Sequence, residues 1–500
     1  MRPRRLGVGT AAALPAGLVA ASSHATEQHP PPRRIVENLD RGPVAVPSGK
    51  GTFLSRRLPG TECALPQVLG SARTGGTPTG DAIAFNVHKG GRRLNQAPVA
   101  RSTTYQDDSR GTGTYTVRAV VNGHERKPSS AALDLARGYA EIPPAAADGY
   151  TVQHAWPGDL DGDGRYELVV SRLAQTRDKP DLLEAYTLTG ARLWRVDLGP
   201  GSYTQVGGNG ANDPAPATIS GSTPIGGYRN DDNVTVYDLD GDGKAEVLVH
   251  TADGTTFADG AKVTANSPAH QFISVIDGET GTERTRQPVP DDLVADGPSG
   301  GHFGIADLDG VHPSLVTKLV TRGSAADIDP GRPGYGYWTS TADVTRPGAG
   351  VFNAQDGKVS TTTPSVNFRS WWDGDKGAEL LDCTHVDKWD PKAETSTRLF
   401  DPAGVVPGAR NATPFYGDLL GDGREEILAE TGDHTALRLC TTTEPTKTRI
   451  HTLAQNPGHR LGWTVRGHLQ STYTDYCLGT ETRRVPKPAV TTAARTEGTS

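Results

Sequence analysis

Short apolar segments separated by glycine- and proline-rich turns run along most of the chain. Residues 84–87 and 115–121 alternate apolar with polar positions, and the second segment ends at the pair Asn122-Gly123. A period of two is typical of a half-buried β-strand, and Asn-Gly favours a tight hairpin turn. No apolar pattern of helical period extends over a useful length. The pattern therefore predicts an all-β protein.

A longer unit recurs from Tyr150 onward. It consists of a loop with the pattern Asp-x-Asp, an apolar run such as residues 168–170 or 247–249, and then a hairpin turn. Such repetition is typical of β-propellers, in which each blade is a four-stranded sheet of about 40 to 45 residues. The loops begin near Asp159, Asp238, Asp307, Asp327 and Asp418.

The interval between two of these loops is too short for a blade. Only 20 residues separate Asp307 from Asp327, fewer than the roughly 40 that four strands require. Either both loops belong to one blade, or the chain lacks material between Thr321 and Ala325. We expect a propeller with missing blades.

Two of the loops are complete enough to bind a cation. Carboxylates at positions 1, 3, 5 and 9, with glycines where the backbone doubles back, surround one point with hard oxygens, which suits Ca²⁺ rather than zinc or iron. A calcium ion that stiffens the turn is favoured over one that grips a substrate. The predicted ligands are Asp159, Asp161, Asp163 and Glu167 in one loop and Asp238, Asp240, Asp242 and Glu246 in the other.

Composition and the N-terminus suggest where the protein works. The net charge of -7, without a basic stripe, argues against a nucleic-acid partner. Residues 1–25 have the basic, apolar and small-residue order of a secretory signal, and no other run reaches the roughly 18 apolar residues that span a bilayer. We expect a secreted monomer without a membrane anchor. The four cysteines share no metal-binding spacing, and Cys440 with Cys477 is the disulfide pair to test first.

The expected domains follow from these patterns. Residues 26–36 read as a flexible leader, residues 37–144 as a small N-terminal β-sandwich, and residues 145–485 as the calcium-binding propeller. Cys63 to Gly80 would be a loose insertion in the sandwich. The polar tail, residues 486–500, is expected to be disordered.

Several of these segments together resemble a known family. The chain is similar, motif by motif and in the same order, to the rhamnogalacturonan lyases of polysaccharide lyase family 11, over about residues 37 to 480. The segments that carry the resemblance are residues 39–46, 84–87, 158–167, 237–246, 371–375 and 421–426.

The resemblance implies a fold and a reaction. Members of this family are secreted bacterial enzymes with a small β-domain and an eight-bladed propeller, which bind calcium and cleave the rhamnose-galacturonate backbone of pectin by β-elimination. That reaction removes the weakly acidic proton at C5 of galacturonate, so it requires a base and a positive charge near the carboxylate. The expected substrate is rhamnogalacturonan I, and the expected cofactor is Ca²⁺.

The chain departs from the family pattern at several positions. The family has a lysine where this chain has Asn411. The positive charge expected at that place is therefore absent, unless Arg410 supplies it. The loop at Asp327 lacks its closing carboxylate, with Gly336 in that place, and the loop at Asp418 has Leu420 where a second Asp is usual, so we expect both to bind metal poorly. A catalytically impaired pectin-binding propeller is therefore the alternative to a lyase, and an adhesin-like calcium propeller is a third possibility.

The same resemblance suggests site residues. Arg460 and His468 lie in a region that would face the cleft, and with Arg410 they are the candidates for catalysis. Trp371 and Trp372 are candidate platforms for sugar rings, although packing between blades is an equal alternative, and at most one of two adjacent strand residues can face the cleft. Asn411 and His154 complete the predicted substrate-binding residues.

Overall fold

The structure is a computed structural model. It describes residues 34–493 apart from 63–66, 69–82, 110–112, 143–148, 177–178, 200–233, 265–270, 289–301, 307–313, 319–323, 330, 333–334, 339–349, 354–356, 366, 409–411, 447, 466–471, 477 and 480–483. The predicted signal and most of the predicted leader and insertion lie outside the described residues.

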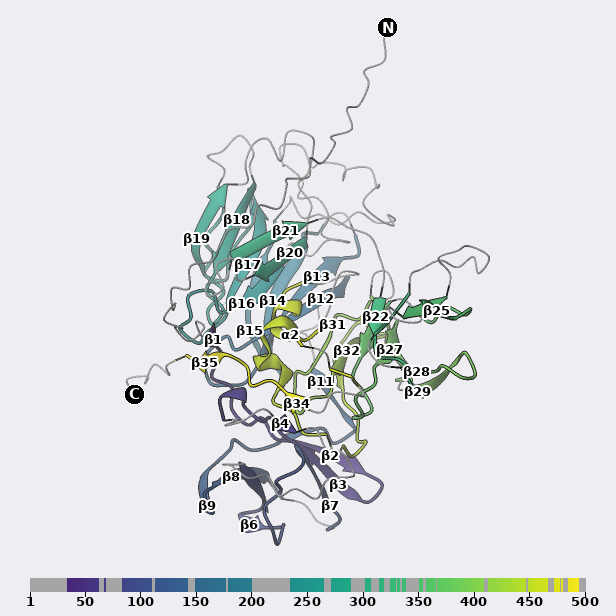
Figure 1. The fold of residues 1–500 in the computed structure, drawn as a ribbon. Coiled ribbons are helices and arrows are strands. Elements are labelled where there is room, and N and C mark those ends of the chain that lie inside the picture. Colours follow the sequence, from purple (N-terminus) through teal and green to yellow (C-terminus); the bar gives the residue numbers. More distant parts are fainter. Residues whose placement is uncertain are drawn as a thin grey trace, which may run out of the picture. The chain divides into compact units, whose positions relative to one another are not determined.

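Two four-stranded sheets form the N-terminal region, at the purple and blue end of the colour bar (Figure 1). Ala45 and Leu54 of one sheet share a buried cluster with Val87 and Tyr115 of the other, so the two sheets pack face to face. The predicted strands at 84–87 and 115–121 are confirmed. One sheet has the order β10 (Leu133–Asp134), β2 (Val44–Ser48), β3 (Gly51–Ser55), β7 (Thr104–Asp107), and the other β6 (Arg92–Arg93), β5 (Ala84–Lys89), β8 (Tyr115–Val121), β9 (His124–Pro128).

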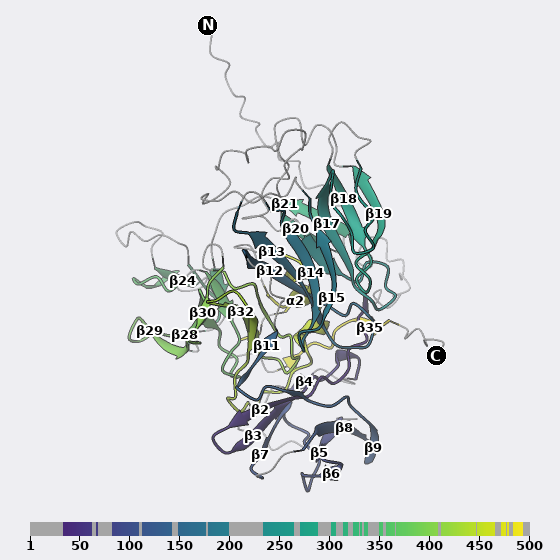
Figure 2. The same cartoon turned by 180° about the vertical axis from the view of Figure 1, so that it is seen from behind.

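Six further sheets follow within the described part of the chain, and we number them in chain order (Figures 1 and 2). Consecutive strands pair antiparallel in each of sheets 1 to 5. Sheet 1 comprises β12 (Tyr150–Gly158), β13 (Glu167–Ala174), β14 (Leu182–Thr187) and β15 (Arg192–Asp197); sheet 2 comprises β16 (Val234–Tyr237), β17 (Glu246–Ala252), β18 (Gln271–Ile276) and β19 (Glu283–Pro288). Sheet 3 comprises β20 (His302–Ala306) and β21 (Ser314–Lys318).

Apart from β11, the strands of the remaining sheets come from the green and yellow part of the colour bar. Sheet 4 comprises β22 (Ser324–Ala326), β23 (Gly336–Trp338), β24 (Val351–Asn353) and β25 (Gly357–Ser360); sheet 5 comprises β26 (Phe368–Ser370), β27 (Glu379–Asp382), β28 (His385–Asp390) and β29 (Thr395–Phe400). Sheet 6 comprises β30 (Val405–Val406), β31 (Phe415–Gly417), β32 (Glu426–Thr431), β33 (Leu437–Cys440) and a strand from before sheet 1, β11 (Tyr139–Ile142).

Neighbouring sheets share buried apolar clusters. One cluster joins sheets 1 and 2, a second joins 1 and 6, a third joins 4 and 5, and a fourth joins 5 and 6. The first strands β16 and β20 lie side by side and connect sheets 2 and 3. Among the described residues no buried cluster joins sheets 3 and 4. This is the junction at which the sequence indicates missing material.

The strand β11 closes the arrangement. Tyr139 pairs with Cys440 and Ile142 with Leu437, so a segment that precedes sheet 1 completes the last sheet. The ends of the chain are tied in a similar way. β1 (Arg34–Val36) pairs parallel with β35 (Val490–Thr492), and β4 (Gln67–Val68) pairs antiparallel with β34 (Arg484–Val485). Residues 490–492, which lie within the tail that the sequence analysis expected to be disordered, thus form a strand with the N-terminal segment.

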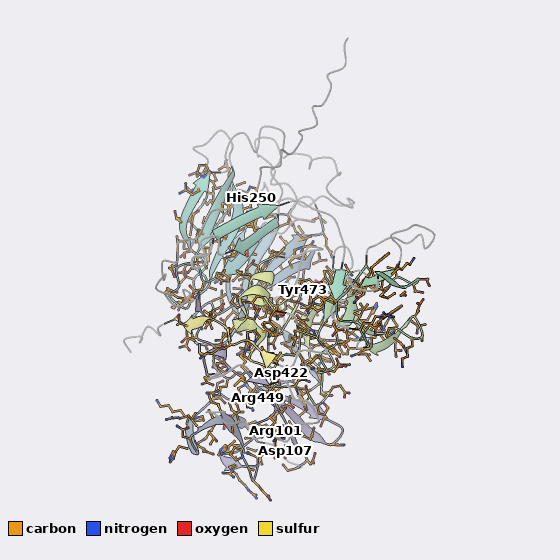
Figure 3. All side chains as sticks on the ribbon, in the orientation of Figure 1. Arg101, Asp107, His250, Asp422, Arg449 and Tyr473 are labelled. Carbon is orange, nitrogen blue, oxygen red and sulfur yellow. The ribbon has the colours of Figure 1, made fainter. Side chains whose placement is uncertain are left out.

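The sequence analysis missed a short helix, α2 (Pro457–Gly462). Its start carries the usual signals, since Asn456 accepts a hydrogen bond from the backbone N–H of His459 at 3.0 Å and Pro457 occupies the first turn. The described residues also include the 3-10 turns η1 (Gly60–Glu62) and η4 (Leu453–Gln455). The loop before η4 contacts the sandwich, where Arg449, labelled in Figure 3, donates to the carbonyl oxygens of Ile83 and Ala100.

The cysteine pairing proposed from the sequence is not formed. Cys440 is a free, buried thiol on β33, and burial raises its pKa to about 12. Cys383 is also free, whereas Cys63 and Cys477 lie outside the described residues.

A buried ion pair fixes α2 to the N-terminal segment. The guanidinium of Arg460 donates to Oε1 of Glu37 at 2.5 and 3.2 Å, and both side chains are at most 4% exposed. A buried charge that loses its partner costs several kcal/mol, whereas an exposed pair contributes little.

We expect Arg460→Ala to lower the free energy of unfolding by about 3–5 kcal/mol, because it leaves the Glu37 carboxylate buried without its partner. Urea denaturation measures the change. The control is Arg137→Ala, which breaks an exposed pair with Glu141 and should cost less than about 1 kcal/mol. A double variant, Glu37→Gln with Arg460→Met, should regain part of the loss. Equal costs for Arg460→Ala and Arg137→Ala would contradict a structural role for the buried pair.

Candidate metal loops

Four loops carry acidic residues in the same register, and they join β12 to β13, β16 to β17, β26 to β27 and β31 to β32. We call them loop 1 (residues 159–167), loop 2 (238–246), loop 5 (371–379) and loop 6 (418–426), after the sheet that each belongs to. Loops 1, 2 and 6 each contain two glycines with positive φ, for example 79° at Gly162 and 90° at Gly164. Such angles suit glycine and allow the backbone to fold back on its own carboxylates.

The loops are linked to one another by backbone hydrogen bonds. In each case the residue before the closing Glu donates its N–H to the carbonyl oxygen of the first residue of the preceding loop. Ala245 donates to Asp159 at 2.8 Å, Ala378 to Asp327 at 2.7 Å, and Glu425 to Trp371 at 2.8 Å. This regularity fixes the register of the loops, including those that lack part of the acidic pattern. It shows that Trp371 occupies the place of the first Asp in loop 5.

Loop 1 gathers carboxylates around one point. Oxygen atoms of Asp159, Asp161 and Glu167 lie within 4.8 Å of one another. Asp159 accepts backbone N–H groups of Gly162 and Gly164 at 2.8 and 3.0 Å, and Glu167 accepts that of Leu160 at 3.0 Å.

Loop 2 repeats this geometry. Asp238, Asp240 and Glu246 form the cluster, and Asp238 accepts from Gly241 and Gly243 at 2.7 and 3.0 Å. The structure thus brings together three of the four predicted ligands in each loop. The carboxylates of the fourth ones, Asp163 and Asp242, accept from the backbone of Arg165 and Lys244, both at 2.8 Å.

The electrostatics of both loops favour a bound cation. Burial, followed by the charge of Glu37, raises the pKa of Asp159 to about 8 and that of Asp238 to about 7. Burial raises the pKa of Glu167 to about 8 and that of Glu246 to about 7, and neighbouring carboxylates add to the effect. Groups that resist ionisation because like charges crowd them are stabilised by a cation among them. An all-oxygen donor set suits Ca²⁺ or another hard divalent ion.

Loop 5 is a third carboxylate cluster, which the sequence analysis did not include among the metal ligands. Asp373, Asp375 and Glu379 have oxygen atoms within 4.8 Å of one another. The ammonium of Lys388, on β28, contacts all three. Burial acts to lower the pKa of Lys388, but Glu379 and the two aspartates outweigh it and raise that pKa. The lysine was missed because it lies outside the loop in sequence.

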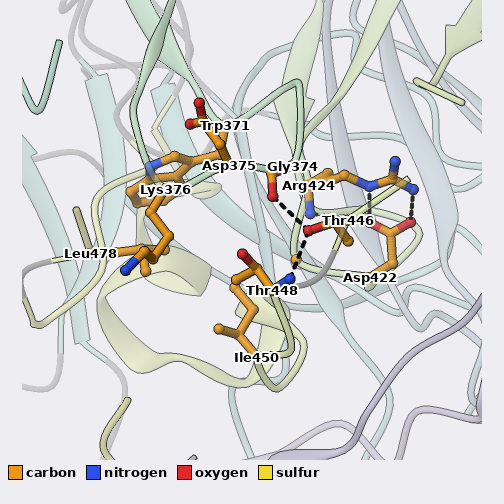
Figure 4. Close-up of a pocket in the computed structure, with 11 residues that line it drawn as sticks. Trp371, Gly374, Asp375, Lys376, Asp422, Arg424, Thr446, Thr448, Ile450 and Leu478 are labelled. Atoms are coloured by element: carbon orange, nitrogen blue, oxygen red, sulfur yellow. Dashed lines mark hydrogen bonds and ion pairs between the residues drawn. The ribbon is translucent and has the colours of Figure 1, made fainter. Parts of the chain in front are cut away.

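Loop 6 uses an arginine instead. Arg424 is fully buried and pairs with Asp422 at 2.5 Å. Burial, followed by the charge of Asp422, raises the pKa of Asp418 well above its usual value. Loops 5 and 6 are neighbours, since Trp371 and Asp375 of one and Asp422 and Arg424 of the other line the same small cavity (Figure 4).

Four of the residues predicted to act on the substrate lie in the described part of the chain, and all four are buried: His154, Trp371, Trp372 and Arg460. Arg460 is 2% exposed and paired with Glu37, which favours a structural role, and its proposed part in catalysis stays a prediction. His154 is also 2% exposed and packs its ring against Trp156. Arg410, Asn411 and His468 lie outside the described residues, and their proposed roles stay predictions.

The tryptophan pair fits the packing alternative. Trp371 and Trp372 are 3% and 4% exposed and belong to different core clusters, as expected for adjacent residues that point to opposite sides. Trp371 packs against the guanidinium of Arg369, and Trp372 against the ring of Phe400. These contacts favour packing between sheets over a sugar platform, and a role of either ring in substrate binding stays a prediction.

Known proteins match this chain over nearly its full length. The family described as rhamnogalacturonan I lyases beta-sheet domain matches residues 34–133, and the family described as rhamnogalacturonan lyase family 11, C-terminal domain, matches residues 314–488. Rhamnogalacturonan endolyase YesW of Bacillus subtilis is 30% identical, with 97% of this chain and 98% of that protein covered. Rhamnogalacturonan exolyase YesX of the same organism is 26% identical, with 92% and 98% covered.

Solved structures agree with the sequence matches. The crystal structure of YesW has a TM-score of 0.76 at 27% identity and covers 92% of this chain and 100% of that one. The alignment with YesW spans 653 positions and this chain has 500 residues, so at least 153 positions of the alignment face a gap in this chain. The chain is therefore internally shorter than its relative. It belongs to rhamnogalacturonan lyase family 11 and is a polysaccharide lyase.

Proposed function

We propose that this protein is a secreted, calcium-dependent lyase that cleaves the rhamnose-galacturonate backbone of pectin by β-elimination. The observation that carries the proposal is the combination of family membership with two acidic loops whose oxygen atoms converge within 4.8 Å. Relatives of nearly complete overlap are named as an endolyase and an exolyase of rhamnogalacturonan, which supports rhamnogalacturonan I as the substrate.

The six sheets are best interpreted as blades of a propeller that has lost blades between sheets 3 and 4. Three observations support this interpretation. The first strands β12 and β16 lie side by side, as do β16 and β20. The strand β11 joins β33, which resembles the closure of a ring. The alignment with YesW also leaves at least 153 positions without a counterpart in this chain of 500 residues.

We assign the ions a role in the fold rather than in gripping the substrate. Asp159 is fully buried, and loop 1 contacts the N-terminal segment through a hydrogen bond of 2.8 Å from the N–H of Asp40 to the carbonyl of Gly164. Calcium, when bound, would supply the positive charge that these buried carboxylates lack. Asp159, Asp161 and Glu167 would hold one ion, and Asp238, Asp240 and Glu246 another.

β-Elimination requires a base at C5 and a positive group at the galacturonate carboxylate. Arg410 and His468 remain the proposed residues for these two tasks. The guanidinium would bind and orient the carboxylate, and the imidazole would accept the proton. Secretion is proposed from residues 1–25 alone. Among the described residues, no helix is long and apolar enough to cross a membrane.

One prediction from the proposed function concerns the reaction itself. Incubation with rhamnogalacturonan I and CaCl₂ should generate the ultraviolet absorbance of an unsaturated uronate, which only elimination produces. The control is polygalacturonate, which has no rhamnose and should give no signal. Binding of rhamnogalacturonan without turnover would favour the impaired alternative, and absence of both would exclude a pectin-directed function.

The second prediction concerns metal removal. Chelation with EDTA should lower the melting temperature of the protein, and added CaCl₂ should restore it, because the ion binds only the folded loops. At a calcium concentration about 100 times the dissociation constant, one site contributes about 2.7 kcal/mol. Differential scanning calorimetry measures the shift.

A pair of variants locates this effect. Glu167→Gln with Asp159→Asn should lose part of the calcium-dependent shift, because both residues belong to the cluster of loop 1. The matched control is Asp401→Asn, a carboxylate that is 59% exposed and paired with Arg398. Identical calcium-dependent shifts in the loop variant and the control would argue against a metal in loop 1.

A further inference from the structure

Loop 5 keeps most of the backbone scaffold of a cation loop. In loops 1, 2 and 5 the closing Glu accepts the backbone N–H of the residue seven positions earlier, at 3.0, 2.9 and 2.7 Å. The Asp at the third position accepts the N–H of the residue two further on, at 3.0, 3.2 and 3.1 Å. The loops differ in their first residue, where loop 5 has Trp371, and that residue packs in the apolar core.

Loop 5 also differs in the residue that lies opposite its closing Glu on the neighbouring strand. In sheet 1, Thr187 pairs with the closing Glu167. In sheet 6, Thr441 donates to the closing Glu426 at 3.0 Å. In sheet 5, Leu380 pairs with Asp387, so Lys388 comes opposite the closing Glu379. A threonine in two sheets is thus replaced by a cation in the third.

The position of the ammonium group is that of a bound cation. Nζ of Lys388 lies 2.7 Å from Asp373, 2.8 Å from Asp375 and 2.6 Å from Glu379. These are the same three residues whose oxygen atoms converge within 4.8 Å. An ammonium has three N–H donors, so each carboxylate receives one charge-assisted hydrogen bond. A divalent ion in this cluster would have to displace Lys388 or tolerate its repulsion.

Loop 2 provides an instructive contrast. Arg284 contacts Asp240 at 3.2 Å and Glu246 at 2.8 Å, but it is shared with Asp277 at 2.9 Å. Loop 2 also keeps Asp238 as its first carboxylate. The arginine therefore neutralises only part of loop 2, whereas Lys388 contacts every member of the loop 5 cluster.

We propose that Lys388 is a built-in counter-cation that takes the place of a divalent ion in loop 5, and that its removal opens a new divalent-cation site there. The inference rests on the proposed binding of calcium by loops 1 and 2. Under this proposal, loops 1 and 2 bind calcium and loop 5 does not.

The test is to count the calcium ions bound per chain. Lys388→Thr copies sheets 1 and 6 and should bind one more Ca²⁺ than the unaltered protein in equilibrium dialysis. Lys388→Met, which keeps the length of the side chain, should gain the same ion, and it serves if the threonine variant folds poorly. Lys388→Arg keeps the charge and should gain none. Adding Glu379→Gln to Lys388→Thr should remove the extra ion.

Stability provides a second readout. In EDTA, Lys388→Thr should melt below the unaltered protein, because three carboxylates then face one another without a cation, and saturating CaCl₂ should recover most of the difference. An unchanged ion count in both Lys388→Thr and Lys388→Met would overturn the proposal. So would loss of a calcium ion on changing Glu379→Gln in the otherwise unaltered protein, since loop 5 would then already hold metal.

The ion counts also distinguish failure of calcium binding by loops 1 and 2 from failure of the inference on Lys388. If the unaltered protein binds no calcium, while Lys388→Thr gains one ion, loops 1 and 2 are not metal sites but the inference on Lys388 stands. If the unaltered protein loses an ion in the Asp159→Asn variant, while Lys388→Thr gains none, only the inference on Lys388 fails.

Discussion

The structure depends on neutralising negative charge where its sheets meet. The turns that connect the first two strands of a sheet place carboxylates close together and partly away from water, and such groups repel one another unless a cation lies among them. Loops 1 and 2 converge three oxygen ligands each, loop 5 contains the ammonium of Lys388, and loop 6 contains the buried guanidinium of Arg424. One backbone pattern thus carries different sources of positive charge.

These turns also connect the sheets mechanically. Loops 2, 5 and 6 each donate a backbone hydrogen bond to the first residue of the preceding loop, and the hydrophobic clusters join the same pairs of sheets. The ion pair between Glu37 and Arg460 adds α2 and the N-terminal segment to this assembly.

The sequence predicted features that depend on local pattern. Alternation identified β8, and the spacing of Asp and Glu identified loops 1 and 2, because both reflect residues close together in the chain. It failed where distant residues decide. Lys388 enters loop 5 from the next strand, Glu37 pairs with the buried Arg460, and β1 pairs with a segment near the C-terminus. The tryptophan pair was ambiguous because aromatic residues suit both sugar binding and packing between sheets.

The mixed origin of sheet 6 has a consequence for how the protein is made. Its strand β11 comes from before sheet 1, while its partner β33 comes from near the end of the chain. During synthesis, β11 has no partner strand until β33 has been made, which follows the strands of almost every other sheet. Late pairing of distant segments is slow and leaves edges open to association with other chains.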